Sequence, residues 1–172
     1  MEIPILASFR WVSGELLSAQ RVHMRYSSSG RKFRRAVFIT GPLAILFGIG
    51  ILVTHGIHPV GLFFIIIGAA LLASPLFARR MTLKHYAQRP DRDMLVSWEF
   101  YPDRIISKTE ASSASMEWRM ISRVLRTKQG FLLYPNDRIF HWLPIHAFRQ
   151  STDIESFAQL AKSNVKHFDH VA

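Results

Sequence analysis

The chain has 172 residues and contains no cysteine, which excludes a disulfide framework and thiol chemistry and fits domains that face a reducing compartment. Acidic residues are absent between Leu16 and Pro90, although this stretch contains ten of the 22 Lys and Arg residues. The other twelve basic residues balance the twelve acidic ones, so the formal charge of +10 arises in this stretch alone. We therefore do not interpret the high basicity as a sign of nucleic-acid binding.

Motifs that carry chemistry are also missing. The sequence contains no P-loop, no GxGxxG, no GxSxG and no HExxH. His55 and His58 flank a short break without a nearby carboxylate, and a solvated tail accounts for His167 and His170. We therefore expect no enzyme activity, no catalytic residues, no cofactor and no metal site.

Two long apolar runs organise the chain. They cover residues 36–54 and 60–78, contain no charged residue, and are separated by His55-Gly56-Ile57-His58-Pro59. Each run has 19 residues, which as a helix spans roughly 28 Å, close to the hydrocarbon thickness of a bilayer. Because core helices of soluble proteins usually keep a polar stripe, we predict a transmembrane hairpin over residues 36–78 instead.

Small residues in the two runs predict close helix packing. Gly41, Ala44 and Gly48 share one face of the first run, and Gly61 and Gly68 share one face of the second. Small side chains let helix backbones approach each other where lipid supplies no hydrophobic drive. Chance glycine frequency explains the same pattern, so both interpretations stay open. We also expect Pro75 to bend or end the second helix.

The charges predict the orientation of the hairpin. Basic residues flank both runs, whereas the break between them carries no Lys or Arg, so the positive-inside rule places both termini in the cytoplasm. The predicted membrane-anchoring or headgroup-contacting residues are Arg31, Lys32, Arg34, Arg35, Arg79, Arg80 and Lys84. The last three allow either a specific lipid site or plain anchoring.

The N-terminal segment, residues 1–35, is predicted to be cytoplasmic. Residues 3–11 alternate imperfectly, which favours a strand, and the pattern does not settle whether that strand joins a sheet. Residues 14–26 favour a helix. This helix either lies at the membrane surface or packs on the soluble domain, and the sequence supports both equally.

The chain beyond the hairpin predicts a basic linker at residues 79–93, then a β-rich domain at 94–166 and a tail at 167–172. The domain shows about six short alternating strands separated by turn residues, which is typical of an antiparallel meander. Thr152 and Glu155 form a capping-box pattern ahead of a final helix. That helix presents one apolar face, made by Ile154, Phe157, Ala158, Ala161 and Val165.

The order of these parts is similar to that of the YcxB-like family of small bacterial membrane proteins. The residues that carry the resemblance are the helix start at 13–16, the hairpin, and the stretches 100–105, 118–124, 130–133 and 143–149. It implies an inner-membrane protein with a C-terminal PH-like domain, an antiparallel meander of six or seven strands capped by a helix. It implies no catalytic residue. Trp118, Ile121 and Val124 favour core positions in such a domain.

The function that we expect is a protein-interaction or regulatory module displayed at the inner membrane, with an unidentified protein partner or a second copy of the chain. A structural subunit of a membrane complex is an alternative. Lipid-headgroup binding is another, since a basic run without an acid forms a possible ligand or partner surface at Arg119, Arg123, Arg126 and Lys128. Residues 91–172 carry a net charge of only +1, which favours protein interaction.

Overall fold

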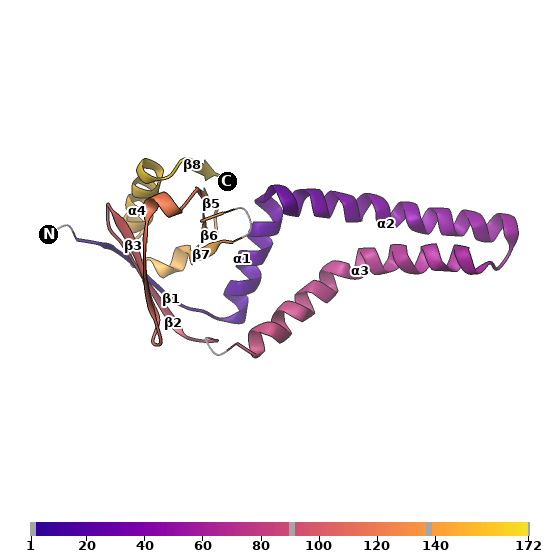
Figure 1. The fold of residues 1–172 in the computed structure, drawn as a ribbon, viewed down its shortest axis with the longest axis horizontal. Coiled ribbons are helices and arrows are strands. Elements are labelled where there is room, and N and C mark those ends of the chain that lie inside the picture. Colours follow the sequence, from indigo (N-terminus) through magenta and orange to yellow (C-terminus); the bar gives the residue numbers. More distant parts are fainter. Residues whose placement is uncertain (1–2, 90–91, 137–138, 172) are drawn as a thin grey trace. The chain divides into compact units, whose positions relative to one another are not determined.

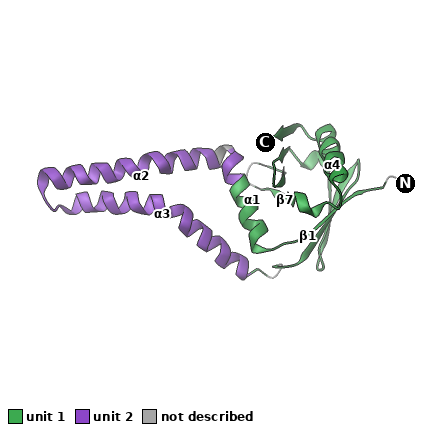
Figure 2. Cartoon of the chain, turned by 180° about the vertical axis from the view of Figure 1, so that it is seen from behind, with its two compact units in different colours: residues 1–22, 89–172 green, residues 23–88 purple. Residues whose placement is uncertain are grey.

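The computed structural model describes residues 3–89, 92–136 and 139–171 (Figure 1). The chain divides into two compact units, coloured separately in Figure 2. Unit 1 combines Met1–Val22 with Arg89–Ala172, and unit 2 is His23–Gln88. The first part of the N-terminal segment, up to Val22, thus folds with the β-rich part of the chain, although the hairpin separates the two in sequence.

Sheet A of unit 1 has four antiparallel strands in the order β1-β2-β3-β4. The strands are β1 (Ile5–Arg10), β2 (Leu95–Phe100), β3 (Arg104–Lys108) and β4 (Ser113–Glu117). All six residues of β1 pair with β2, from Ile5 opposite Phe100 to Arg10 opposite Leu95. The N-terminal strand predicted from the sequence is therefore confirmed, and it is part of the sheet.

Sheet B has the order β7-β6-β5-β8. Its strands are β5 (Arg123–Arg126), β6 (Gly130–Tyr134), β7 (His141–Pro144) and β8 (His167–His170). Strand β8 runs parallel to β5, whereas the other pairs are antiparallel. The interpretation of residues 167–172 as a solvated tail is therefore wrong for His167–His170, because backbone pairing with β5 orders that segment.

A short 3-10 helix, η1 (Trp118–Met120), separates the two sheets in sequence. The Trp118 side chain is buried, and its indole Nε1 donates a hydrogen bond of 2.8 Å to the Tyr101 carbonyl. The sequence predicts one meander here, but the chain turns at Trp118 and starts a second sheet. The α+β class with a two-helix hairpin is confirmed, and the PH-like architecture stays a prediction.

Helix α4 (Ser151–Asn164) packs where the two sheets meet. The Phe157 ring centroid lies 4.4 Å from that of Phe100 in sheet A and 4.8 Å from that of Phe131 in sheet B. All three side chains are almost fully buried, so this aromatic cluster is the centre of the core. The core positions predicted for Trp118, Ile121 and Val124 are confirmed too.

The capping box predicted for α4 does not form. Gln150 is the N-cap residue and makes no side-chain capping hydrogen bond, while the Thr152 hydroxyl donates to the Gln150 side chain. The Glu155 carboxylate accepts hydrogen bonds from the Arg126 guanidinium instead. A charge-assisted pair with strand β5 is stronger than a contact with a backbone N–H, which explains the difference.

Three helices connect β1 to β2. They are α1 (Ser13–Tyr26), α2 (Ser28–His55) and α3 (Pro59–Ala87), and η2 (Ile145–Ala147) completes the helical elements of the described residues. Ser27 alone separates α1 from α2, and its hydroxyl accepts a hydrogen bond of 3.0 Å from the Gly30 N–H. Helix α2 begins well before the predicted apolar run at residues 36–54, and α3 ends well after the run at residues 60–78.

Glycines set the contact between α2 and α3. A Cβ atom built on Gly48 would lie 2.5 Å from the Gly61 carbonyl oxygen, and one on Gly68 would lie 2.6 Å from that of Gly41. No real side chain tolerates such contacts, so these backbones approach each other because the residues are glycine. The predicted packing is confirmed. Helix α3 continues past Pro75 to Ala87 and bends along its length (Figure 1).

Candidate functional site

The hairpin helices are long and apolar enough to span a membrane. The spans Gly30–His55 and Pro59–Ala87 each have a mean hydropathy of 2.4 in their most apolar window. Only 17% and 11% of these windows are buried. A pair of core helices in a soluble protein would be mostly buried, so the exposed apolar surface supports the membrane interpretation.

The predicted anchoring residues lie at one end of this hairpin. Because α2 and α3 are antiparallel and joined at Gly56–His58, the start of α2 and the end of α3 lie away from that turn. The anchoring side chains at these two ends are all exposed; they are Arg31, Lys32, Arg34 and Arg35 on α2, and Arg79, Arg80 and Lys84 on α3. The base of the hairpin is therefore strongly basic and its tip is not.

The tip of the hairpin carries His55 and His58. The Nδ1 atom of His55 lies 2.7 Å from the Thr54 hydroxyl, and Nδ1 of His58 accepts a hydrogen bond from the Val60 N–H. Both imidazole rings therefore form hydrogen bonds with neighbouring residues at the ends of α2 and α3. No group of three metal-ligating side chains occurs among the residues that the structure describes.

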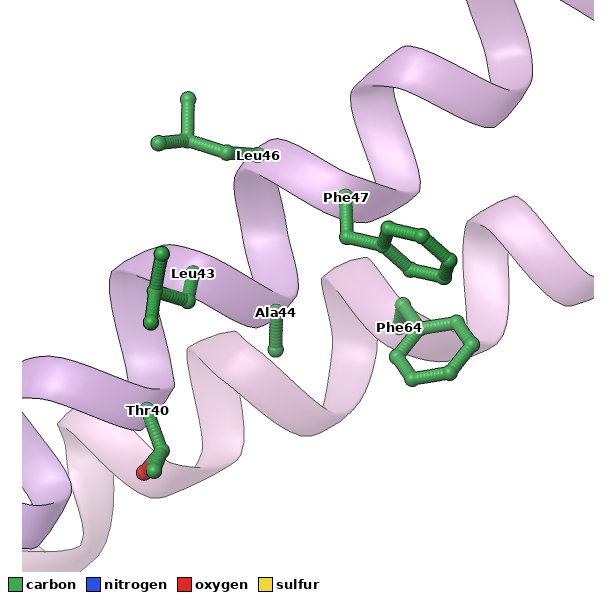
Figure 3. A pocket seen from close by; sticks show the side chains of 6 residues that line it. All are labelled: Thr40, Leu43, Ala44, Leu46, Phe47 and Phe64. Carbon is green, nitrogen blue, oxygen red and sulfur yellow. The ribbon is translucent and has the colours of Figure 1, made fainter.

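An apolar hollow opens along the hairpin. It has a volume of about 560 Å³ and is lined by Thr40, Leu43, Ala44, Leu46, Phe47 and Phe64 (Figure 3). The Phe47 and Phe64 rings meet edge to face, with centroids 4.9 Å apart. Thr40 has the only polar side chain in this lining, and its hydroxyl donates to the Ala36 carbonyl. The lining of the hollow is therefore almost wholly apolar.

The predicted basic surface begins on η1 and continues along β5. The structure brings Arg119, Arg123 and Arg126 close to three carboxylates. Arg119 Nε lies 2.6 Å from Glu117, Arg123 Nε lies 2.6 Å from Asp169, and both terminal nitrogens of Arg126 contact Glu155. Lys128 lies exposed in the turn between β5 and β6. Each carboxylate therefore offsets the charge of the arginine that it contacts.

These ion pairs had no local signal in the sequence, apart from the pair of Arg119 with Glu117. Glu155 follows Arg126 by 29 residues, and Asp169 follows Arg123 by 46 residues. The Arg126 guanidinium holds the pKa of Glu155 below its usual value, and Glu155 raises the pKa of Arg126. Each group therefore stabilises the charged form of the other, and both stay ionised at neutral pH.

A second polar contact ties α1 to sheet B. The Trp142 indole Nε1 donates a hydrogen bond of 2.7 Å to the Glu15 carboxylate, whose other oxygen lies 3.5 Å from Nε2 of His146. Glu15 and Trp142 are 127 residues apart, so sequence reasoning missed this contact. It fixes the first turn of α1 on unit 1, which supports packing on the soluble domain for this part of the helix.

Burial shifts the pKa values of two ring side chains in sheet B. It raises the pKa of Tyr134 to about 12, an effect that the nearby Arg123 guanidinium opposes. It lowers the pKa of His141, whose ring centroid lies 5.6 Å from that of Trp98. Both groups are therefore neutral at pH 7, and neither has the geometry of an acid–base pair.

Comparison with known proteins finds a match to a protein family. A family model described as YcxB-like protein matches residues 100–161, from the last residue of β2 into α4. No curated protein and no solved structure matches the chain. The match confirms the resemblance predicted from the sequence, and residues 100–161 are similar to the YcxB-like family.

Proposed function

We propose that the chain is an integral inner-membrane protein that displays unit 1 in the cytoplasm as a protein-interaction or regulatory module without catalysis. Two helices that can span a membrane and a basic hairpin base support the anchoring. The YcxB-like match over residues 100–161 supports the same assignment.

One observation favours a protein over a lipid as the partner: the arginines of the predicted basic surface form ion pairs with carboxylates of the same chain. Headgroup phosphates are bound by Arg and Lys side chains that are free to donate. Here each of Arg119, Arg123 and Arg126 already donates to one carboxylate, that of Glu117, Asp169 or Glu155, which offsets its charge. A folded surface of alternating charge fits a protein partner better than a phosphate, so protein interaction takes precedence over lipid binding.

The test uses the full-length protein, because a fragment of residues 91–172 would lack strand β1. The protein is reconstituted in nanodiscs of neutral lipid and titrated with soluble inositol phosphates by calorimetry. A variant with Arg119, Arg123, Arg126 and Lys128 all replaced by Gln is the matched control. We expect no binding by either protein. Salt-sensitive binding that only the variant loses would make headgroup recognition the function.

A second arm tests the protein partner directly. A photo-crosslinking residue replaces Leu6 or Met120, whose side chains are exposed on unit 1, and the buried Leu132 serves as the control position. We expect a discrete adduct with one protein, in native membranes, from an exposed position only. The same background from all three positions would contradict the proposed role.

A further inference from the structure

Strand β4 forms an open edge of sheet A. It pairs with β3 on one side, and no strand of the described residues pairs with its other side. The Thr109 N–H donates to the Ser112 carbonyl at the start of this hairpin. Bonded and non-bonded pairs alternate from there, so Ala114 and Met116 bond to β3 while the N–H and C=O groups of Ser113 and Ser115 point outward.

Most of the usual protections of an edge strand are missing from β4, whose one charged residue, Glu117, is the last of the strand. Natural edges carry Lys, Pro, a bulge or a covering segment, which prevent pairing with another chain. β4 reads Ser-Ala-Ser-Met-Glu, its register with β3 is uninterrupted, and all of its residues except Met116 are exposed. This edge is therefore able to accept a further strand.

We propose that β4 pairs with β4 of a second copy of this chain, antiparallel about a two-fold axis at Ser115. This register places Ser115 opposite Ser115 of the second copy, and Ser113 opposite Glu117 of the second copy. These are the residues whose backbone groups point outward, so the hydrogen-bonding pattern of one edge fits that of the other. Ala114 and Met116 then meet across the non-bonded positions.

The charges fit the same register. Glu117 lies beside Arg104 of its own β3, and Ser113 lies beside Lys108. Two-fold pairing therefore places Lys108 of the second copy two strands from Glu117, roughly 10 Å away. No two like charges stand opposite each other in the eight-stranded sheet, which removes the repulsion that prevents edge pairing elsewhere.

A five-residue strand buries less surface than a stable interface between freely diffusing proteins requires. Confinement in one membrane raises the effective concentration of the two edges and favours pairing without additional contacts. The inference therefore rests on the proposed membrane anchoring and names one partner of the interaction module.

The test exploits the lack of cysteine in the natural chain. Full-length Ser115→Cys in native membranes is oxidised and run on a non-reducing gel. Opposed residues of a bonded antiparallel pair have Cα atoms about 5.5 Å apart, within the range of a disulfide. We expect the band to shift to twice the monomer mass. Ser8→Cys, exposed on β1 and away from this edge, is the control and should stay monomeric.

Two further variants test the register. Ser113→Cys and Glu117→Cys should not crosslink alone, and should crosslink when the two variants share a membrane. Adding Ser115→Pro should abolish this crosslink, because proline removes an outward N–H and leaves the ladder to β3 intact. Tryptophan fluorescence checks folding, since all four tryptophans lie in unit 1.

Equal crosslinking of Ser115→Cys and Ser8→Cys would overturn the self-pairing. If the photo-crosslinking residue at Leu6 or Met120 still captures another protein in that case, the proposed function stands without self-pairing through β4. If Ser115→Cys crosslinks but Ser113→Cys also crosslinks with itself, the two strands pair in a different register. That result would overturn the two-fold model.

Discussion

Single residues decide which surfaces of unit 1 are available. Arg123 and Arg126 lie three positions apart on β5, and each meets a carboxylate from the C-terminal part of the chain. The sequence groups them as one basic run because it shows the cations together and the anions far away. The folded chain presents paired charges, which is a second reason, besides the low net charge of residues 91–172, to expect a protein partner ahead of phosphate.

Removing these carboxylates should create the site that the sequence suggests. In the double variant Glu155→Gln and Asp169→Asn, the guanidinium groups of Arg126 and Arg123 lose their partners and become free to bind phosphate. We expect the variant to bind inositol phosphates in a salt-sensitive manner in the nanodisc titration, where the natural chain does not. Glu110→Gln, an exposed change without an ion pair among the described residues, is the matched control. No gain in binding by the double variant would mean that the pairs do not mask a phosphate site.

Glycine positions in the hairpin give a second prediction. Gly48→Ala places a methyl group against the Gly61 carbonyl, whereas a Cβ at Gly50 meets no atom within 4 Å. Overpacking of this kind costs about 1–3 kcal/mol. Helical melting of the detergent-solubilised protein, followed by far-UV circular dichroism, should begin at a lower temperature for Gly48→Ala than for the control Gly50→Ala. Equal melting curves would show that α2 and α3 do not pack through these glycines.

His141 gives a pH dependence. Burial lowers its pKa in the folded state, so the unfolded state binds more protons once the pH falls below about 6.5. Stability should therefore be constant above that pH and decrease as the pH falls toward 5. Tryptophan-fluorescence melts of His141→Gln should show a smaller decrease between pH 7.5 and 5 than melts of His146→Gln, an exposed histidine. Parallel decreases in the two variants would contradict this role of His141.

At the scale of elements, local patterns were enough for the hairpin and most strands. The uncharged runs predict α2 and α3, and alternation predicts strands β1 to β7. Strand β8 was not predicted from the sequence. Its partner β5 lies about forty residues earlier, and its own sequence, His-Phe-Asp-His, contains a single apolar side chain. Glu15 and Glu155 also contact residues far away in the sequence, so no local pattern reveals these contacts.

Strand β1 should be essential to unit 1, although the whole hairpin separates it from the rest of the sheet. Phe9 faces the core and is only 5% exposed, whereas the neighbouring Ser8 faces solvent. Phe9→Ala should cost about 3–5 kcal/mol and lower the tryptophan-fluorescence midpoint, with Ser8→Ala close to the natural chain. A midpoint for Phe9→Ala that matches the natural one would show that β1 contributes little to the fold of unit 1.

At the scale of the whole molecule, the proposed arrangement follows from charge. Basic side chains gather at the base of the hairpin, and the tip at Gly56–His58 has none. The positive-inside rule assigns the base to the cytoplasm. Both chain segments that build unit 1 leave the hairpin from this base, which is why a single orientation accounts for its N-terminal and C-terminal parts together.

Cysteine accessibility tests this arrangement most directly, since the natural chain offers no background reaction. Ile57→Cys lies at the tip, where the side chain is 92% exposed, and Ser163→Cys lies exposed on α4. In intact spheroplasts a membrane-impermeant maleimide should label Ile57→Cys at once and Ser163→Cys only after permeabilisation. Labelling of Ser163→Cys in intact spheroplasts, or of both positions alike, would contradict the cytoplasmic display of unit 1 on a membrane hairpin.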